Sequence, residues 1–174
     1  MRFGRAGALS KVLFCIATWI FAAAAARAAG HFSLAASAGR FGLLRGGSAF
    51  EAGGELRCAP RSFRWLPRVA AGISPVAGGM ATSDGELYAY AGLRLEVPLG
   101  KAWMLSPQSA AGLYHAGDGK DLGGAVEFRS GFELSRRIGA RSSLGLLLYH
   151  LSNAGLYRRN PGTESLVLTY SLRP

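Results

Sequence analysis

Strict alternation between apolar residues and polar or small residues runs through three segments of this chain. In residues 87–99, Leu, Ala and Val occupy the odd positions, while Tyr, Gly, Arg and Glu occupy most of the even ones. Residues 126–134 and 50–57 repeat the pattern. Neighbouring side chains of a strand point to opposite faces, whereas a helix repeats about every 3.6 residues. The alternation therefore predicts β-strands with one apolar and one polar face.

Five further segments have strand-like composition with weaker alternation: 32–41, 69–77, 103–114, 142–152 and 164–172. Together with the first three they predict eight strands. Eight antiparallel strands can close into a small barrel whose interior is filled by side chains. The sequence shows no domain boundary, low-complexity linker or glycine-rich nucleotide motif.

The N-terminal segment predicts export. Arg2, Arg5 and Lys11 precede an apolar run over 12–26, and Ala26-Arg27-Ala28 has the small-x-small form of a cleavage site. We expect residues 1–28 to be a signal peptide and 29–174 to be a single β-barrel domain. The alternative is a retained membrane anchor, which the shortness of the apolar run disfavours.

The composition points to a membrane rather than to a soluble core. Hydrophobic residues make up 49% of the chain and Gly contributes 25 residues, yet 29–174 contains no apolar run of about 18 residues that would mark a membrane helix. An exported, apolar, glycine-rich chain without such a run is typical of a transmembrane outer-membrane β-barrel from a Gram-negative bacterium. Only Cys58 follows the signal peptide, so no internal disulfide is expected.

The charge of the chain favours an anionic partner. Removing Arg2, Arg5, Lys11 and Arg27 with the signal peptide lowers the net charge from +10 to +6. Export disfavours nucleic acid as the partner and favours outer-membrane lipid rich in phosphate. Charged residues on the polar faces of the strands carry both signs, which predicts an internal ion-pair network and no open pore: Glu51, Glu55, Arg57, Arg94, Glu96, Glu127, Arg129 and Glu133. His31 and His115 lack metal-ligand spacing, and no metal or cofactor is expected.

Polar residues extend the apolar faces of the last two strands. His150 and Ser152 continue the parity of Leu144, Leu146 and Leu148, so their Cα atoms lie about 6.6 Å apart on one face. A hairpin centred on position 157 places Glu164 opposite His150, with Cβ atoms about 4.5–5.5 Å apart. These residues predict a catalytic Ser–His–Glu group that faces the lipid.

The same hairpin can be placed in the membrane. An exported eight-stranded barrel with both ends in the periplasm puts the connection between its last two strands outside. Charged side chains on the lipid face cost roughly 2–4 kcal/mol at the midplane but only about 0–1 kcal/mol near the interface. An active site near the extracellular leaflet is therefore tolerable, although His150, Ser152 and Glu164 would also be acceptable there as plain rim residues.

The segment His150-Leu151-Ser152-Asn153-Ala154-Gly155, with Asn160-Pro161-Gly162 and then Glu164, resembles the PagL family of lipid A 3-O-deacylases. The resemblance covers about the last fifty residues. It implies an outer-membrane barrel that removes the ester-linked 3-hydroxyacyl chain at position 3 of lipid A. It also implies a nucleophile at Ser152, a base at His150 and an orienting carboxylate at Glu164. It further implies Asn160 and the backbone N–H of Gly155 as the oxyanion donors, and Asn153 as a support of the loop or of the oxyanion hole.

The sequence offers two candidate phosphate-binding residues in the last loop, and it leaves several alternative functions open. Arg158 and Arg159 are candidate contacts for a lipid A phosphate, or else solvated loop charges. The alternatives to a deacylase are a non-catalytic structural or adhesive barrel, an outer-membrane phospholipase or acyltransferase, and a soluble barrel for an apolar ligand. Whether the barrel forms a homodimer is left open.

Overall fold

The computed structural model describes residues 32–44, 48–66 and 69–173. The expected signal peptide, 1–28, lies outside these residues. Within them every regular element is a β-strand: β1 (Phe32–Phe41), β2 (Ala49–Cys58), β3 (Arg61–Leu66), β4 (Val69–Thr82), β5 (Leu87–Leu99), β6 (Trp103–His115), β7 (Val126–Arg137), β8 (Ser142–Ser152) and β9 (Thr163–Leu172).

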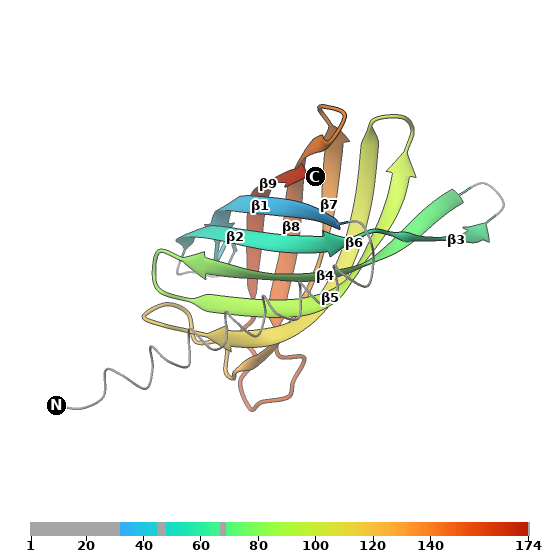
Figure 1. The fold of residues 1–174 in the computed structure, drawn as a ribbon. Helices are drawn as coiled ribbons and strands as arrows, with labels where there is room; N and C mark the ends of the chain where they lie inside the picture. The colour runs from blue at the N-terminus through green and yellow to red at the C-terminus, as the bar shows by residue number, and fades with distance from the viewer. Residues whose placement is uncertain (1–31, 45–47, 67–68, 174) are drawn as a thin grey trace.

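The strands form one closed antiparallel ring (Figure 1). The hydrogen-bonded order runs β2-β1-β9-β8-β7-β6-β5-β4-β3, and an additional pairing of β2 with β4 closes it. Both β2 and β3 pair with β4, one after the other along its length, so they occupy a single position in the wall. The predicted all-β, eight-stranded antiparallel barrel is therefore confirmed.

The segment β3 is the element that the sequence did not predict. Pairing with β4 passes from Arg57↔Val76 to Arg61↔Ile73, which is four steps along one chain and three along the other. One extra residue is accommodated around Pro60, which has no N–H to donate to the ladder. Beyond this bulge, β3 and the start of β4 run on as a hairpin that projects from the ring (Figure 1).

The two ends of the barrel differ in their connections. At one end, here named the turn end, residues 100–102 and 138–141 make short turns beside the start of β1 and the end of β9. At the other, here named the loop end, residues 83–86, 116–125 and 153–162 connect the strands. Short turns at one end and longer loops at the other are typical of outer-membrane barrels.

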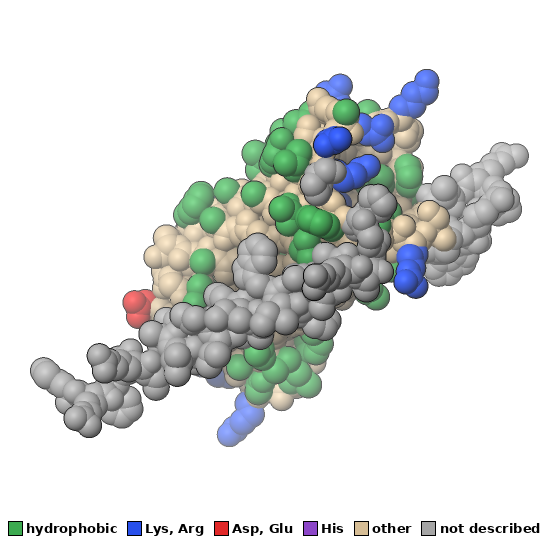
Figure 2. All heavy atoms as spheres, in the orientation of Figure 1, with side chains coloured by type: hydrophobic (Ala, Val, Ile, Leu, Met, Phe, Trp, Pro, Cys, Tyr) green, Lys and Arg blue, Asp and Glu red, His purple; other side chains and the backbone are tan. Residues whose placement is uncertain are grey.

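The outer wall is apolar. On the strands many hydrophobic side chains of the outward parity are exposed, and Figure 2 shows hydrophobic side chains gathered on the face in view. The exposed side chains of the strands include Leu34, Phe50, Ile73, Leu93, Leu113, Phe132, Leu134, Leu146, Leu168 and Tyr170. A soluble monomer rarely exposes so continuous an apolar surface, whereas a barrel wall in lipid requires it.

No helix in the described part of the chain is long and apolar enough to cross a membrane.

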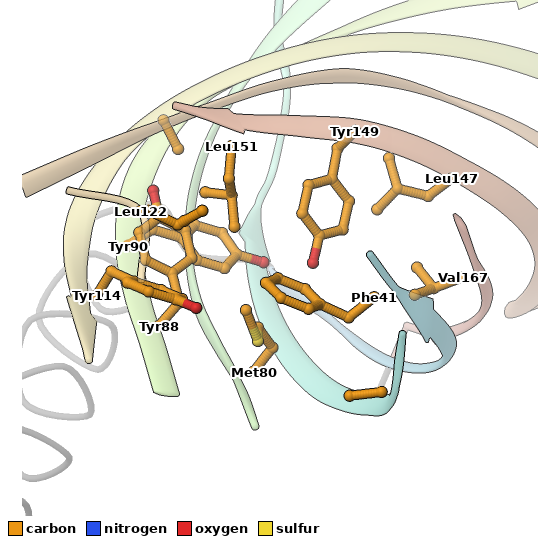
Figure 3. Packing of buried hydrophobic residues seen from close by; sticks show 12 residues of the cluster. Phe41, Met80, Tyr88, Tyr90, Tyr114, Leu122, Leu147, Tyr149, Leu151 and Val167 are labelled. Atoms are coloured by element: carbon orange, nitrogen blue, oxygen red, sulfur yellow. The ribbon is translucent and has the colours of Figure 1, made fainter. Parts of the chain in front are cut away.

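The interior of the loop-end half is packed with aromatic side chains around one cation. The guanidinium carbon of Arg129 lies 4.4 Å from the ring centroid of Tyr90 and 4.1 Å from that of Tyr149. Tyr88 stacks on Tyr90, and Leu122 of the 116–125 loop enters the same cluster with no exposed surface (Figure 3). The barrel is closed here by its own side chains.

Most of the predicted internal ion-pair network is present in the other half, but two of the predicted carboxylates are outside it: Glu51 accepts a hydrogen bond from Tyr149, and Glu127 forms no ion pair with any described residue. Arg57 bonds Glu55 and Glu133 at 2.7 Å each, and Arg94 bonds Glu133 at 3.0 Å. Arg129 reaches Glu55 at 3.5 Å and so connects the network to the aromatic cluster. All five side chains are less than a tenth exposed, so each charge depends on its partners to offset the loss of water.

Candidate active site

The register of the last hairpin brings two of the predicted residues face to face. His150 of β8 pairs across from Glu164 of β9, as the sequence predicted. His150 Nδ1 lies 3.2 Å from Glu164 Oε1. A carboxylate can only accept, so Nδ1 carries the hydrogen, and in the neutral ring Nε2 is the free acceptor.

Both residues lie on the outer wall. Leu147, Tyr149 and Leu151 alternate with His150 along β8, and all three are buried in the barrel interior. The His150 side chain is 41% exposed and that of Glu164 is 17% exposed. These two polar side chains thus continue the apolar faces of β8 and β9, as expected.

Ser152 ends β8, two residues after His150 and on the same outward face. It pairs with Phe128 of the neighbouring strand β7 and is partly buried. The described residues show no hydrogen bond between its hydroxyl and the His150 ring. Such bonds are often long before substrate binds, so the shared face and the two-residue spacing are the relevant geometry.

The chain leaves β8 through a tight turn. Ala154 and Gly155 both have positive φ, at 53° and 81°, and the Leu156 N–H donates to the Asn153 carbonyl at 3.0 Å. Two central residues with positive φ are typical of a type I′ turn. Alanine rarely adopts this conformation, and backbone strain of this kind is concentrated at functional sites.

Asn153 holds the two longest loops of the loop end together. Its side chain has no exposed surface. Its Nδ2 donates to the carbonyls of Leu122 at 2.9 Å and Arg159 at 2.8 Å, and its Oδ1 accepts from the Gly155 N–H at 3.0 Å. Of the two roles that the sequence left open for Asn153, these contacts favour support of the loop.

The two expected oxyanion donors, Asn160 and Gly155, differ in whether their N–H groups are already hydrogen-bonded. Asn160 Oδ1 accepts from the Asn153 N–H at 3.1 Å, which leaves its Nδ2 without a hydrogen-bond partner among the described residues. The Gly155 N–H is already engaged with Asn153. Asn160 therefore has a donor ready for an incoming group, whereas Gly155 must share the one it has.

Gly162 is a site residue that the sequence reasoning did not single out. A Cβ atom at this position would lie 2.8 Å from His150 Cε1 and 3.2 Å from Nε2, and its φ is +59°. The position must therefore be glycine if the Nε2 edge of His150 is to stay open. The Asn-Pro-Gly sequence was the available signal, because glycine after proline marks a turn that needs positive φ.

The two loop arginines are both exposed, but only one is paired. Arg159 Nη1 lies 3.1 Å from Asp121 Oδ2 in an exposed ion pair. Arg158 forms no ion pair with any described residue. The described residues also contain no cluster of three or more His, Cys, Asp or Glu side chains that could hold a metal ion.

Comparison with known proteins places this chain in a family. The model of the PagL lipid A 3-O-deacylase family matches residues 67–173, which is more than half of the chain. Among solved structures, the outer membrane enzyme PagL aligns with a TM-score of 0.66 at 20% identity, covering 80% of this chain and 98% of that one. A de novo designed transmembrane β-barrel aligns with a TM-score of 0.51 at 11% identity, covering 83% and 96%.

Likeness to solved structures at these identities shows the fold alone, and no curated protein sequence matches the chain. The family match includes the whole of the β8–β9 hairpin and its outward-facing polar residues. The chain is an outer-membrane β-barrel and belongs to the PagL family of lipid A 3-O-deacylases, which are hydrolases of ester bonds.

Proposed function

We propose that this barrel removes the ester-linked 3-hydroxyacyl chain at position 3 of lipid A, using Ser152, His150 and Glu164 on its outer wall. The observation that carries the proposal is the His150–Glu164 pair, 3.2 Å apart on a lipid-facing surface. A polar pair costs free energy on such a surface, so its presence beside an outward-facing serine calls for a function.

The mechanism follows from the two reactive groups that are available, the Ser152 hydroxyl and the Nε2 atom of His150. Ser152 Oγ attacks the ester carbonyl carbon while His150 Nε2 accepts the hydroxyl proton. Glu164 accepts the Nδ1–H bond, keeps the ring in the reactive tautomer and stabilises the imidazolium that forms. The tetrahedral intermediate then breaks its bond to the sugar oxygen, which takes the proton from His150 and leaves as the alcohol.

The second half of the cycle repeats these steps with water. His150 removes a proton from water, which attacks the acyl group on Ser152. Collapse of the second tetrahedral intermediate releases the 3-hydroxy fatty acid and returns the proton to Ser152 Oγ. No cofactor enters either half, because proton transfer and covalent catalysis suffice for ester hydrolysis.

Asn160 is the principal oxyanion donor in this scheme. Its Nδ2 has no hydrogen-bond partner in the part of the chain that the structure describes, while its Oδ1 is fixed by the Asn153 N–H. The Gly155 N–H becomes a second donor by sharing its bond with Asn153. Loss of one oxyanion donor typically costs about 2.7–4 kcal/mol of transition-state stabilisation.

The site acts in the outer leaflet of the outer membrane. Longer loops of outer-membrane barrels face the cell exterior and short turns face the periplasm, and Ser152 lies at the loop end. Lipid A is then presented sideways, with its acyl chains along the apolar wall. Arg158 is the freer of the two arginines to contact a lipid A phosphate, because Arg159 is paired with Asp121.

The experiment is mass spectrometry of lipid A from a Gram-negative host that expresses the chain. Wild type should remove one 3-hydroxyacyl mass and Ser152→Ala should remove none. Ser109→Ala is the matched control, because Ser109 is an exposed serine on the outer face of β6. Unchanged lipid A from folded wild-type barrels would exclude the proposal. Release of fatty acid from phospholipid by the same barrels would instead favour a phospholipase.

A further inference from the structure

A polar cavity opens at the turn end, the end of the barrel opposite Ser152. Its volume is about 180 Å³, and residues from β1, β2, β5, β6, β7, β8 and β9 line it. Six of the lining residues are cations and one is a carboxylate, Glu96: the cations are Arg57, Arg94, Lys101, Arg137, Arg141 and Arg173.

The cavity has a floor whose cations are paired with carboxylates and a rim whose cations are not. At the floor, Arg57 and Arg94 are compensated by the buried carboxylates Glu55 and Glu133 and by Glu96. The rim cations form no ion pair with any described residue, and all four are exposed: Lys101, Arg137, Arg141 and Arg173. The mouth therefore carries a local excess of positive charge that nothing in the described chain offsets.

Arg94 supplies an independent sign that a ligand is accommodated. Its side chain is only 3% exposed, yet its Nε and Nη1 atoms have no hydrogen-bond partner within the described chain. The nearest carboxylate oxygen, on Glu96, is 4.0 Å from Nε. Buried N–H groups of a charged side chain are rarely left unpaired, and Arg94 also lines the cavity, so an acceptor that enters beside it, water or an anion, would satisfy these two donors.

We infer that this cavity binds a phosphate group, either as free phosphate or as the headgroup of an anionic phospholipid. One guanidinium group can donate two parallel hydrogen bonds to the oxygens of a phosphate. Arg94 at the floor and the four cations of the rim would together surround one such anion. The volume holds a phosphate with a few waters, since one water takes about 30 Å³ in the liquid.

The outer wall beside the cavity is suited to lipid headgroups. Trp103 and Arg136 are cross-strand partners there, with the guanidinium carbon 5.8 Å from the indole ring centroid. Figure 2 shows Lys and Arg side chains gathered around the end that holds the β5–β6 and β7–β8 turns. Tryptophan and basic residues at this depth are typical of a membrane–water interface. A headgroup could therefore enter the mouth from the adjacent leaflet.

Binding of inorganic phosphate to the full chain in non-ionic detergent tests the site by calorimetry. Arg137→Gln with Arg141→Gln should weaken binding at least about tenfold, because two charges near the anion are lost. The control pair, Arg40→Gln with Arg61→Gln, removes the same charge from exposed residues that do not line the cavity. Binding to the wild type should weaken as salt is raised.

A second arm identifies the source of the phosphate. Native mass spectrometry of the chain taken from phosphatidylcholine nanodiscs containing phosphatidylglycerol should detect a retained phosphatidylglycerol if a headgroup occupies the site. Its loss in the Arg137/Arg141 variant assigns the lipid, and phosphate binding without retained lipid assigns the soluble anion. Absence of both, or an equal loss in the control pair, overturns the inference. Deacylase activity is read separately and does not bear on this result.

Discussion

His150 and Glu164 are cross-strand partners on the outer wall of the barrel, and Nδ1 of one lies 3.2 Å from Oε1 of the other. The pair joins β8 to β9 at the loop end, where β8 ends and β9 begins. Its geometry fixes which ring nitrogen is left to accept a proton, and this gives the first prediction.

Glu164→Gln should lower kcat for lipid A deacylation by about 10²–10⁴-fold with little change in KM. The amide can still reach His150, but it neither selects the reactive tautomer nor stabilises the imidazolium. The measurement is steady-state hydrolysis of purified lipid A in detergent. Tyr170→Phe serves as a control, because Tyr170 is an exposed outward-facing residue of the same strand. Unaltered kcat in Glu164→Gln would remove Glu164 from the mechanism.

Gly162→Ala should abolish activity while the barrel remains folded. The added Cβ would lie 2.8 Å from His150 Cε1 and cover the Nε2 edge. Gly100→Ala is the matched control, because Gly100 also has a positive φ, +74°, but has open space around its Cβ position. Both variants should lose about 1–2 kcal/mol from backbone strain. Only Gly162→Ala should lose turnover, and equal activity in the two would show that the contact with His150 is unimportant.

Asn153→Ala should loosen the loop end without disturbing the strands. It removes the donors to the Leu122 and Arg159 carbonyls, and a buried acceptor left unpaired costs about 1–3 kcal/mol. Faster hydrogen exchange is expected in 116–125 and 153–162, together with reduced activity. Asp118 is an exposed residue of the 116–125 loop, and Asp118→Ala should leave hydrogen exchange unchanged. Protection equal to wild type in Asn153→Ala would contradict the role of this side chain.

The faces and the register of the barrel follow from local sequence, and this explains what was predictable. The alternation of apolar and polar residues, with its period of two, predicts which side chains point outward. A hairpin centred on Tyr157 pairs His150 with Glu164. By contrast, β3 depends on one extra residue at Pro60, which alternation does not reveal.

The bonds of Asn153 and the cation cavity were not predictable for a different reason. Asn153 bonds the carbonyl of Leu122, 31 residues earlier in the chain. The cavity gathers residues from seven strands. Such contacts between distant segments exist only once the ring has closed. Sequence reasoning could name the polar residues involved but not the neighbours that closure would bring to them.

The buried network predicts a large difference between two ion pairs of opposite exposure. Glu133 bonds Arg57 and Arg94 with no exposed surface, whereas Asp121 bonds Arg159 with both side chains more than half exposed. Glu133→Gln leaves buried guanidinium charge uncompensated and should cost about 3–5 kcal/mol. Asp121→Asn should cost about 0–1 kcal/mol, because water already screens the pair. Urea unfolding from lipid vesicles, followed by tryptophan fluorescence, measures both. Equal shifts would mean that water reaches the turn-end interior and that the network does not stabilise the barrel.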